Sequence, residues 1–276
     1  MTTTAVPPAP APARTHEAGV TQLRVLRSEW TKLRSLRSTV FSLLAAVVFI
    51  IGFSALVPSL IVAHWPPRDP QDAIGFDPTS VSLAGVFLAQ LAIGVLGVLL
   101  ITGEYATGMI RATFAAVPRR LPVLWAKAAV YAGTTLLLTV PAVLGAFLIG
   151  QSILSAKHIE TTLGAPHVLR AVVGSALYLV VVGLLGLGLG ALLRNTAAAI
   201  STLFGLLFVL PILVRFLPSS WSGPIGKYLP SAAGQAITAV RAVPRDLSPW
   251  VGFGVFGLYA LVVLALAAGR LLRSDA

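Results

Sequence analysis

Six long apolar runs dominate the chain, and short polar segments separate them. The runs cover residues 39–63, 81–102, 128–150, 168–193, 197–217 and 250–270. Each reaches the ~20 residues that an α-helix needs to cross a hydrocarbon core of ~30 Å. The fourth and fifth runs are nearly continuous, but Arg194 lies between them and predicts a tight turn at 194–196. The pattern predicts six transmembrane helices.

Two segments precede the first run. Residues 1–18 are a Pro/Ala-rich tail with too little apolar bulk to fold, and we expect this tail to be disordered. Residues 19–38 place leucines and Trp30 at helical spacing, with basic residues mostly on the remaining surface. The pattern favours an amphipathic interfacial helix over an ordinary basic flank. Its candidate interface residues are Leu26, Glu29, Trp30, Lys32 and Leu33.

Charge predicts the orientation of the chain in the bilayer. The net charge is +11, and the segments assigned to the inside hold 13 of the 20 Lys and Arg residues. Positive charge concentrates on the cytoplasmic side of membrane proteins. We therefore expect a multi-pass protein of the bacterial plasma membrane with both termini and residues 103–127 in the cytoplasm. Basic patches with interleaved aromatics are absent from the sequence, which argues against a nucleic-acid partner.

Sequence motifs for catalysis and cofactor binding are absent. The chain has no phosphate-cradling G-x-x-x-x-G-K-[ST] loop and no cysteine, and its four histidines are scattered without metal-ligand spacing. The predicted spans hold almost no ionisable groups, so an ion-coupled transporter or an intramembrane hydrolase is disfavoured. We expect no enzyme activity, no metal and no cofactor in this chain.

Two further features carry structural expectations. Glycines recur in the second and fourth spans, for example Gly94, Gly97, Gly183 and Gly186, and small residues let helices approach closely. We expect them to serve packing within the chain, with a share possible at a subunit interface. Residues 218–249 are rich in Pro, Ser and Gly, and short helices dipping into the membrane and a solvated loop are equally compatible with them.

The most informative stretch lies between the second and third spans. In residues 103–127 a carboxylate (Glu104), an arginine (Arg111) and a Pro-Arg-Arg corner interrupt the apolar sequence. Glu104 and Arg111 lie nearly two helical turns apart, close to one face if the segment is a single helix. A compact cytoplasmic segment of this kind indicates contact with a partner.

Four patches of the chain, in order, resemble the permease subunit of a bacterial ABC-2-type ABC transporter. The resemblance covers residues 22–272, with Met109 standing where that family often has a β-branched residue. The patches are RSEWTKLRSLRST (27–39), GEYATGMIRATFAAVPRRLPVLWAK (103–127), GLGLGALLRNTAAAI (186–200) and KYLPSAAGQAI (227–237).

This resemblance implies a fold and a set of partners. The fold would be an all-α membrane protein with six transmembrane helices, the interfacial helix before them, and a short cytoplasmic coupling helix between spans two and three. A separate ABC ATPase would bind ATP and Mg²⁺, and a second permease protomer would complete the transporter. The chain would export amphipathic cargo such as a drug, peptide or lipid.

The resemblance also assigns residues to the ATPase interface. Glu104 would join the end of span two to the coupling helix, Gly108 would allow close backbone approach, and Arg111 would meet an acidic patch of the ATPase. Tyr105, Thr113 and Arg119 would complete this interface.

Two functions of other classes stay open. A membrane anchor or assembly factor would recruit a cytoplasmic protein without moving a substrate. A membrane-embedded enzyme is the less favoured alternative, because the sequence shows no acid–base or metal constellation.

Overall fold

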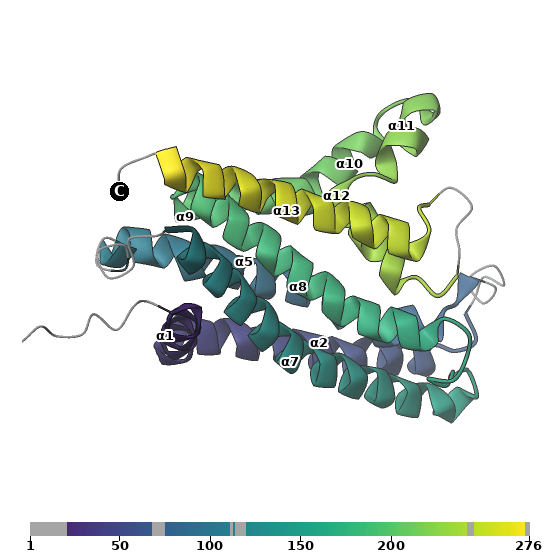
Figure 1. Ribbon diagram of the computed structural model, residues 1–276. Coiled ribbons are helices and arrows are strands. Elements are labelled where there is room, and N and C mark those ends of the chain that lie inside the picture. The colour runs from purple at the N-terminus through teal and green to yellow at the C-terminus, as the bar shows by residue number, and fades with distance from the viewer. Residues whose placement is uncertain (1–20, 68–74, 111–112, 114–119, 242–245, 274–276) are drawn as a thin grey trace, which may run out of the picture.

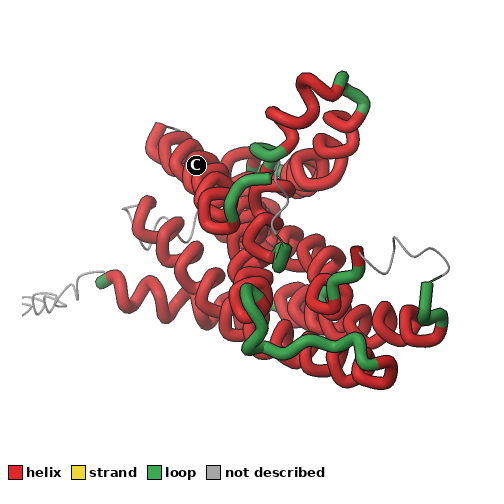
Figure 2. Tube along the Cα trace, turned by 90° about the vertical axis from the view of Figure 1, so that its right-hand side faces the viewer, coloured by secondary structure: helices red, strands yellow, loops and turns green. Residues whose placement is uncertain are grey.

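The computed structural model describes residues 21–67, 75–110, 113, 120–241 and 246–273. Within these ranges the chain is helical and has no strand (Figure 2). Six helices are long and apolar enough to cross a membrane. They are α2 (Arg37–Ala63), α5 (Gly85–Ala106), α7 (Arg120–Leu154), α8 (Val168–Leu193), the continuous α9, η2 and α10 (Thr196–Phe204, Gly205–Val209 and Leu210–Arg215), and α13 (Pro249–Arg273).

Shorter helices connect or flank these six. They are α1 (Gln22–Ser35), α4 (Pro78–Ser82), η1 (Ser155–Lys157), α11 (Ser219–Gly226), α12 (Pro230–Gln235) and η3 (Ala236–Thr238). The helix expected before the first span therefore exists as α1. The coupling helix expected between spans two and three falls mostly on residues outside the described ranges.

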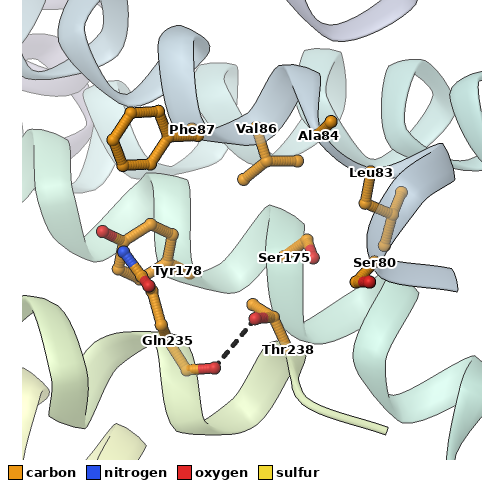
Figure 3. A pocket seen from close by; sticks show the side chains of 9 residues that line it. All are labelled: Ser80, Leu83, Ala84, Val86, Phe87, Ser175, Tyr178, Gln235 and Thr238. Atoms are coloured by element: carbon orange, nitrogen blue, oxygen red, sulfur yellow. Dashed lines mark hydrogen bonds between the residues drawn. The ribbon is translucent and has the colours of Figure 1, made fainter. Parts of the chain in front are cut away.

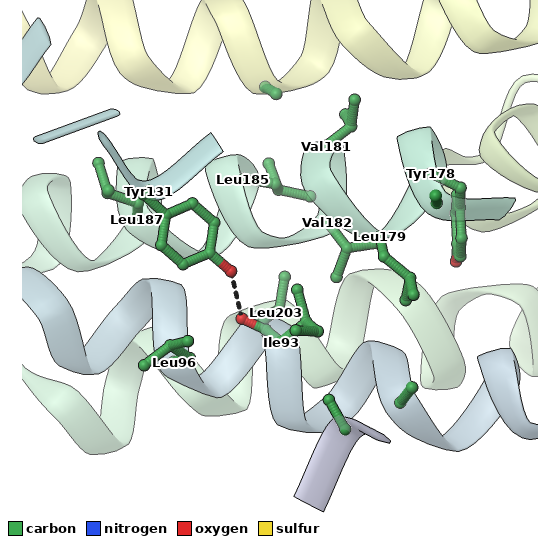
Figure 4. Packing of buried hydrophobic residues seen from close by; sticks show 14 of the residues in the cluster. Ile93, Leu96, Tyr131, Tyr178, Leu179, Val181, Val182, Leu185, Leu187 and Leu203 are labelled. Carbon is green, nitrogen blue, oxygen red and sulfur yellow. Dashed lines mark hydrogen bonds between the residues drawn. The ribbon is translucent and has the colours of Figure 1, made fainter. Parts of the chain in front are cut away.

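Helices α5 and α8 form the centre of the bundle (Figure 1). In the most apolar 18-residue stretch of each helix, 67% of the residues of α5 and 78% of those of α8 are buried, against 17% of those of α2. A side chain on Gly97 would collide with the backbone of Gly183, and one on Gly186 with the backbone of Gly94. These glycines therefore serve packing within the chain, as expected. Figure 4 shows the core beside them, where the Tyr131 hydroxyl donates to the Ile93 carbonyl at 2.7 Å.

The outer helices carry large apolar side chains on their exposed faces. Phe41 on α2, Leu137 on α7 and Leu258 on α13 are each more than half exposed. Apolar patches of this extent are rare on monomeric soluble proteins. The outer surface of the bundle is therefore suited to lipid hydrocarbon.

Two helix boundaries differ from the sequence expectation. The described part of helix α7 begins at Arg120, eight residues before the predicted span, and it tolerates Pro122 near this end because the first turn of a helix does not use the N–H that proline lacks. Its 35 residues give a length of ~52 Å, which exceeds the ~30 Å hydrocarbon core. Helix α5 extends to Ala106 and so contains Glu104. Both helices therefore project charged residues beyond the apolar part of the bundle.

Part of the segment 218–249 packs into the bundle. Ala233 and Ile237 are fully buried, and Gly234 lies directly against Tyr178 of α8 and Phe256 of α13. Trp221 of α11, by contrast, is 62% exposed. Short helices therefore form most of residues 219–238, and the part from Leu229 to Ile237 contributes buried residues to the core.

The two ends of the bundle differ in what they hold. In Figure 1 α1 is viewed end-on while the long helices lie across the picture, so α1 runs roughly perpendicular to them. The end of the bundle that holds α1 also holds the turn between α8 and α9 and the C-terminal end of α13. We call it the α1 end, and we call the opposite end, where α5 begins, the α4 end.

Candidate functional site

Four charged side chains from three helices meet at the α1 end. Glu29 and Lys32 come from α1, Glu104 from α5 and Lys127 from α7. We call these four residues the ion cluster. The two lysines and two carboxylates bond to one another although up to 98 residues separate them in sequence.

The ion cluster is a closed ring of hydrogen-bonded ion pairs. Lys127 Nζ lies 2.5 Å from Glu29 Oε2 and 2.9 Å from Glu104 Oε1. Lys32 Nζ lies 2.7 Å from Glu29 Oε1 and 3.2 Å from Glu104 Oε1. Each lysine therefore bridges both carboxylates, and each carboxylate binds both lysines. With two charges of each sign, the ring is neutral.

Burial makes this neutrality necessary. Lys127 is 1% exposed, Glu29 3% and Glu104 5%. Removing an ion from water costs several kcal/mol, and a close partner of opposite charge is needed to offset this cost. Burial alone would lower the pKa of Lys32, but the hydrogen bond to Glu29 and the charge of Glu104 raise it above its usual value. The charged forms of the ring therefore stabilise one another.

Apolar contacts on both sides of Glu29 hold α1 in place. Val25, Glu29 and Leu33 are spaced four residues apart, so they lie on one face of the helix, and all three are buried. Val25 packs against Val123 and Ala126 of α7. Leu33 joins the main core. The position of Glu29 between these anchors aims its carboxylate at Lys127.

The opposite edge of α1 remains exposed. Trp30 is 45% exposed and Leu23 57%, while Leu26 is half-buried beside Val25. The apolar positions that predicted one face are therefore divided, because Leu33 turns into the core while Trp30 points outward. Lysines pair with the Glu29 carboxylate, and this pairing allows the face of α1 that carries Glu29 to be the buried face.

One bond extends the ion cluster toward the segment after α5. Lys32 Nζ donates to Thr113 Oγ1 at 3.2 Å. Glu104 Oε2 is buried and has no hydrogen-bond partner among the described residues. Arg111 and Arg119, which the sequence assigned to the same interface, lie outside the described residues. Of the expected interface residues, the structure thus brings Glu104 and Thr113 together through Lys32.

The end of α5 corrects one expectation about Glu104 and Arg111. Helix α5 ends at Ala106, and Gly108 adopts φ +71, the left-handed conformation that favours glycine. The helix that holds Glu104 therefore ends five residues before Arg111 in the sequence, whereas the expectation placed both charges on a single helix. No atom of the described chain lies within 4 Å of a Cβ built on Gly108, so within this chain glycine is favoured there by its backbone conformation. The expected close approach of a partner to Gly108 stays a prediction.

Tyr105 connects this region to the turn between α8 and α9. The guanidinium carbon of Arg194 lies 5.2 Å from the centre of the Tyr105 ring, which is a cation–π distance. Next to this contact, Thr196 Oγ1 donates to Thr102 Oγ1 at 2.9 Å. Arg194 itself closes α8 with φ +56. The predicted tight turn therefore exists and is fixed to the end of α5.

Lys127 is the site residue that sequence reasoning missed. It directly precedes the third apolar run, where a lysine reads as an ordinary cytoplasmic flank. The only available signal was rarity, since the chain has four lysines and nine acidic residues. Its pairing with Glu29 depends on how α1 lies across α7, which no local pattern specifies.

The geometry of the ion cluster suits a mechanical role. Three of its four side chains are buried, and each lysine is bonded to both carboxylates. Among the described residues no group of three or more His, Cys, Asp and Glu side chains could hold a metal ion. What the ring does is join α1, α5 and α7 into one unit.

No protein-family model matches the chain, and no curated protein matches it.

Proposed function

We propose that the chain is the transmembrane permease subunit of a bacterial ABC-2-type ABC transporter that exports amphipathic cargo. A separate ABC ATPase would drive it, and a second permease protomer, identical or similar, would complete the pathway. The α1 end would face the cytoplasm in the plasma membrane. The ion cluster carries this proposal, because it ties three helices together next to the segment that would contact the ATPase.

The ion cluster supplies a route from the partner to the spans. A force on the segment after α5 reaches Thr113, then Lys32, and through Lys32 both carboxylates of the ring. Separating one member would leave a buried charge without its partner, which commonly costs about 3–5 kcal/mol. It is therefore less costly for α1, α5 and α7 to move together than to separate. Rigid-body movement of packed helices is an established mode of switching.

Two further observations agree with a transport role. The sequence offers no nucleotide-binding loop, so ATP hydrolysis would belong to the partner. The exposed apolar faces of α2, of α9 with α10, and of α13 leave ample surface for lipid and for a second protomer. Walls of this kind suit cargo that is itself partly apolar.

The test is co-expression of the chain with a candidate ATPase subunit, followed by copurification and a transport assay in lipid vesicles. We expect Glu104→Gln and Arg111→Ala to insert into the membrane normally but to reduce ATPase copurification, transport or both by about tenfold or more, as loss of an interfacial charge contact does. Glu160→Gln is the matched control, because Glu160 is exposed and lies between α7 and α8 at the α4 end.

The outcomes separate the candidate functions. Normal transport and normal ATPase retention in both variants would show that the coupling role is wrong. A chain that retains the ATPase but transports no amphipathic test compound would identify an anchor or assembly factor instead. ATP hydrolysis by the purified chain, free of any ATPase subunit, would contradict the proposal that a separate subunit hydrolyses ATP.

A further inference from the structure

A second polar site lies at the α4 end, remote from the ion cluster. It is a cavity of about 200 Å³ between α4, α5, α8, α12 and η3 (Figure 3). Its polar lining consists of Ser80, Ser175, Tyr178, Gln235 and Thr238, and Leu83, Val86 and Phe87 form much of its apolar wall. The volume is somewhat below the ~300 Å³ at which pockets for drug-sized ligands begin. The cavity can therefore enclose one chemical group rather than a whole drug-sized molecule.

The hydroxyl protons around the cavity are already used within the protein. Ser80 Oγ donates to the Asp77 carbonyl at 3.0 Å, Ser175 Oγ to the Ala171 carbonyl at 2.8 Å, and Thr238 Oγ1 to the Gln235 carbonyl at 2.8 Å. The Tyr178 hydroxyl donates to Gln90 Oε1.

These bonds determine what the hydroxyl oxygens can still bind. A hydroxyl has one proton to donate and two lone pairs to accept. With their protons engaged, the four oxygens retain only accepting capacity. The hydroxyls of the cavity are therefore set to receive hydrogen bonds from a donor.

The charge of the lining side chains further limits the kind of ligand that the cavity can bind. None of the lining side chains carries a formal charge at neutral pH. Neither Asp77, the nearest acid in sequence, nor Arg170, which donates to the Ala239 carbonyl at 2.5 Å, belongs to the lining of the cavity. An ion in this cavity would have no partner of opposite charge, and burying an unpaired ion is costly. The preferred ligand is uncharged.

The walls of the cavity are held in place from outside. Gln151 of α7 donates to Ser82 Oγ at 2.9 Å and to the Pro78 carbonyl at 3.1 Å, which fixes α4. The bond from Arg170 fixes the end of η3 beside Thr238. The site is therefore preformed, and ligand binding does not lose free energy to the ordering of its walls.

We propose that this cavity binds an uncharged, hydroxyl-bearing group that has an apolar edge, such as the sugar of a glycoside or a polyol. The hydroxyls of the ligand donate to the oxygens of Ser80, Ser175 and Thr238, and its carbon face packs against Phe87. The group can belong to a free polyol or to the head of an amphiphile. The site lies within one chain, so it depends on no ATPase and is independent of the function proposed above.

A single cysteine reports on occupancy, because the chain has none of its own. Ser80 is exposed and lines the cavity, so Ser80→Cys in lipid nanodiscs places a reactive thiol at its edge while the accepting oxygens of Ser175 and Thr238 remain to bind the ligand. The measurement is the rate of modification by a small methanethiosulfonate reagent. Four probes are compared: glucose, hexyl β-glucoside, hexyl sulfate and hexyltrimethylammonium. Ser152→Cys, an exposed serine on α7, is the control for partitioning into the membrane.

We expect hexyl β-glucoside to slow the modification of Ser80→Cys saturably, by fivefold or more, and to leave Ser152→Cys unchanged. Protection by glucose as well would identify a free polyol as sufficient, whereas protection by the glucoside alone would identify an amphiphile. Adding Ser175→Ala or Thr238→Val removes one accepting oxygen at nearly constant shape. Each should weaken the apparent affinity about three- to tenfold, the factor expected for one neutral hydrogen bond.

Several results would overturn the proposal. These are no protection by glucose or by the glucoside, equal slowing at both cysteines, equal or stronger protection by either charged probe, and protection that survives Ser175→Ala and Thr238→Val unchanged. Ala84→Leu gives a second test, because it fills the cavity without removing an oxygen and should abolish protection.

Discussion

Lys127 is the side chain on which the stability of the ion cluster most depends. The residue is 1% exposed, and its ammonium group binds Glu29 at 2.5 Å and Glu104 at 2.9 Å. Lys127→Met retains a similar apolar stem but leaves two buried carboxylates with one lysine. Breaking a buried pair in this way costs about 3–5 kcal/mol, mainly because a charge is left without a partner.

The magnitude can be bounded from the remaining contacts. Lys32 still binds both carboxylates, and its side chain is 23% exposed, so water can reach part of the ring. We therefore expect a loss near the lower limit, about 3 kcal/mol of unfolding free energy. The double variant Glu104→Gln/Lys127→Met again has equal numbers of both charges. Its loss should be smaller than the sum of the single losses by about 1.5 kcal/mol or more, as for coupled neighbours.

The assay is unfolding in mixed micelles titrated with sodium dodecyl sulfate and followed by circular dichroism. Lys157→Met is the matched control, because Lys157 is an exposed lysine on η1, and its effect should stay within about 0.5 kcal/mol. A Lys127→Met variant as stable as the control would refute the reasoning. So would single losses that add exactly in the double variant, since the two charges would then be independent.

Three further predictions concern packing, pH and orientation. Gly97→Ala should destabilise the protein by about 1–3 kcal/mol, because the added methyl group overpacks the contact of α5 with α8. The measurement is the same titration with sodium dodecyl sulfate. Gly145→Ala is the control, because a Cβ at Gly145 meets open space, and it should stabilise the protein slightly. The folded-state pKa of Lys32 is raised above 10.5, so its stabilising contribution should be complete below pH ~10 and lost as pH rises through the folded-state pKa. The difference in unfolding free energy between wild type and Lys32→Met should therefore be constant from pH 7 to ~10 and become smaller above it. With the α1 end in the cytoplasm, an impermeant thiol reagent should label Glu160→Cys in intact cells but label Arg34→Cys only after lysis, and the reverse pattern would invert the topology.

The amino-acid sequence by itself determined the number, order and approximate extent of the membrane-length helices. Hydrophobic length is a local property, and a run of ~20 apolar residues has few alternatives to a helix. The turn at Arg194 and the helix before the first span were predictable for the same reason, since a charge and a helical spacing are visible in a short window. The glycines of α5 and α8 also indicated a close contact between helices.

The tertiary structure alone decided the contents of the candidate site. Glu104 was recognised because a carboxylate at the end of an apolar run is conspicuous, but its partners lie on α1 and α7. Lys127 looked like a flanking charge, and Glu29 was a candidate interface residue for which the sequence indicated no partner within the chain. Only the crossing of α1 over α7 buries both and makes them pair, and that crossing angle results from packing of Val25 and Leu33 against distant residues.

The same distinction holds at the α4 end. The composition of residues 218–249 left a solvated loop and short helices dipping into the membrane equally open, because polar and small residues suit both. The burial of Ile237 and Ala233 in the bundle depends on Gly174 and Gly252, whose missing side chains make room for them. Local pattern specifies what a segment can form, whereas the complementary space left by other helices decides whether it is buried. For this protein that space also creates the polar cavity, which no stretch of the sequence encodes alone.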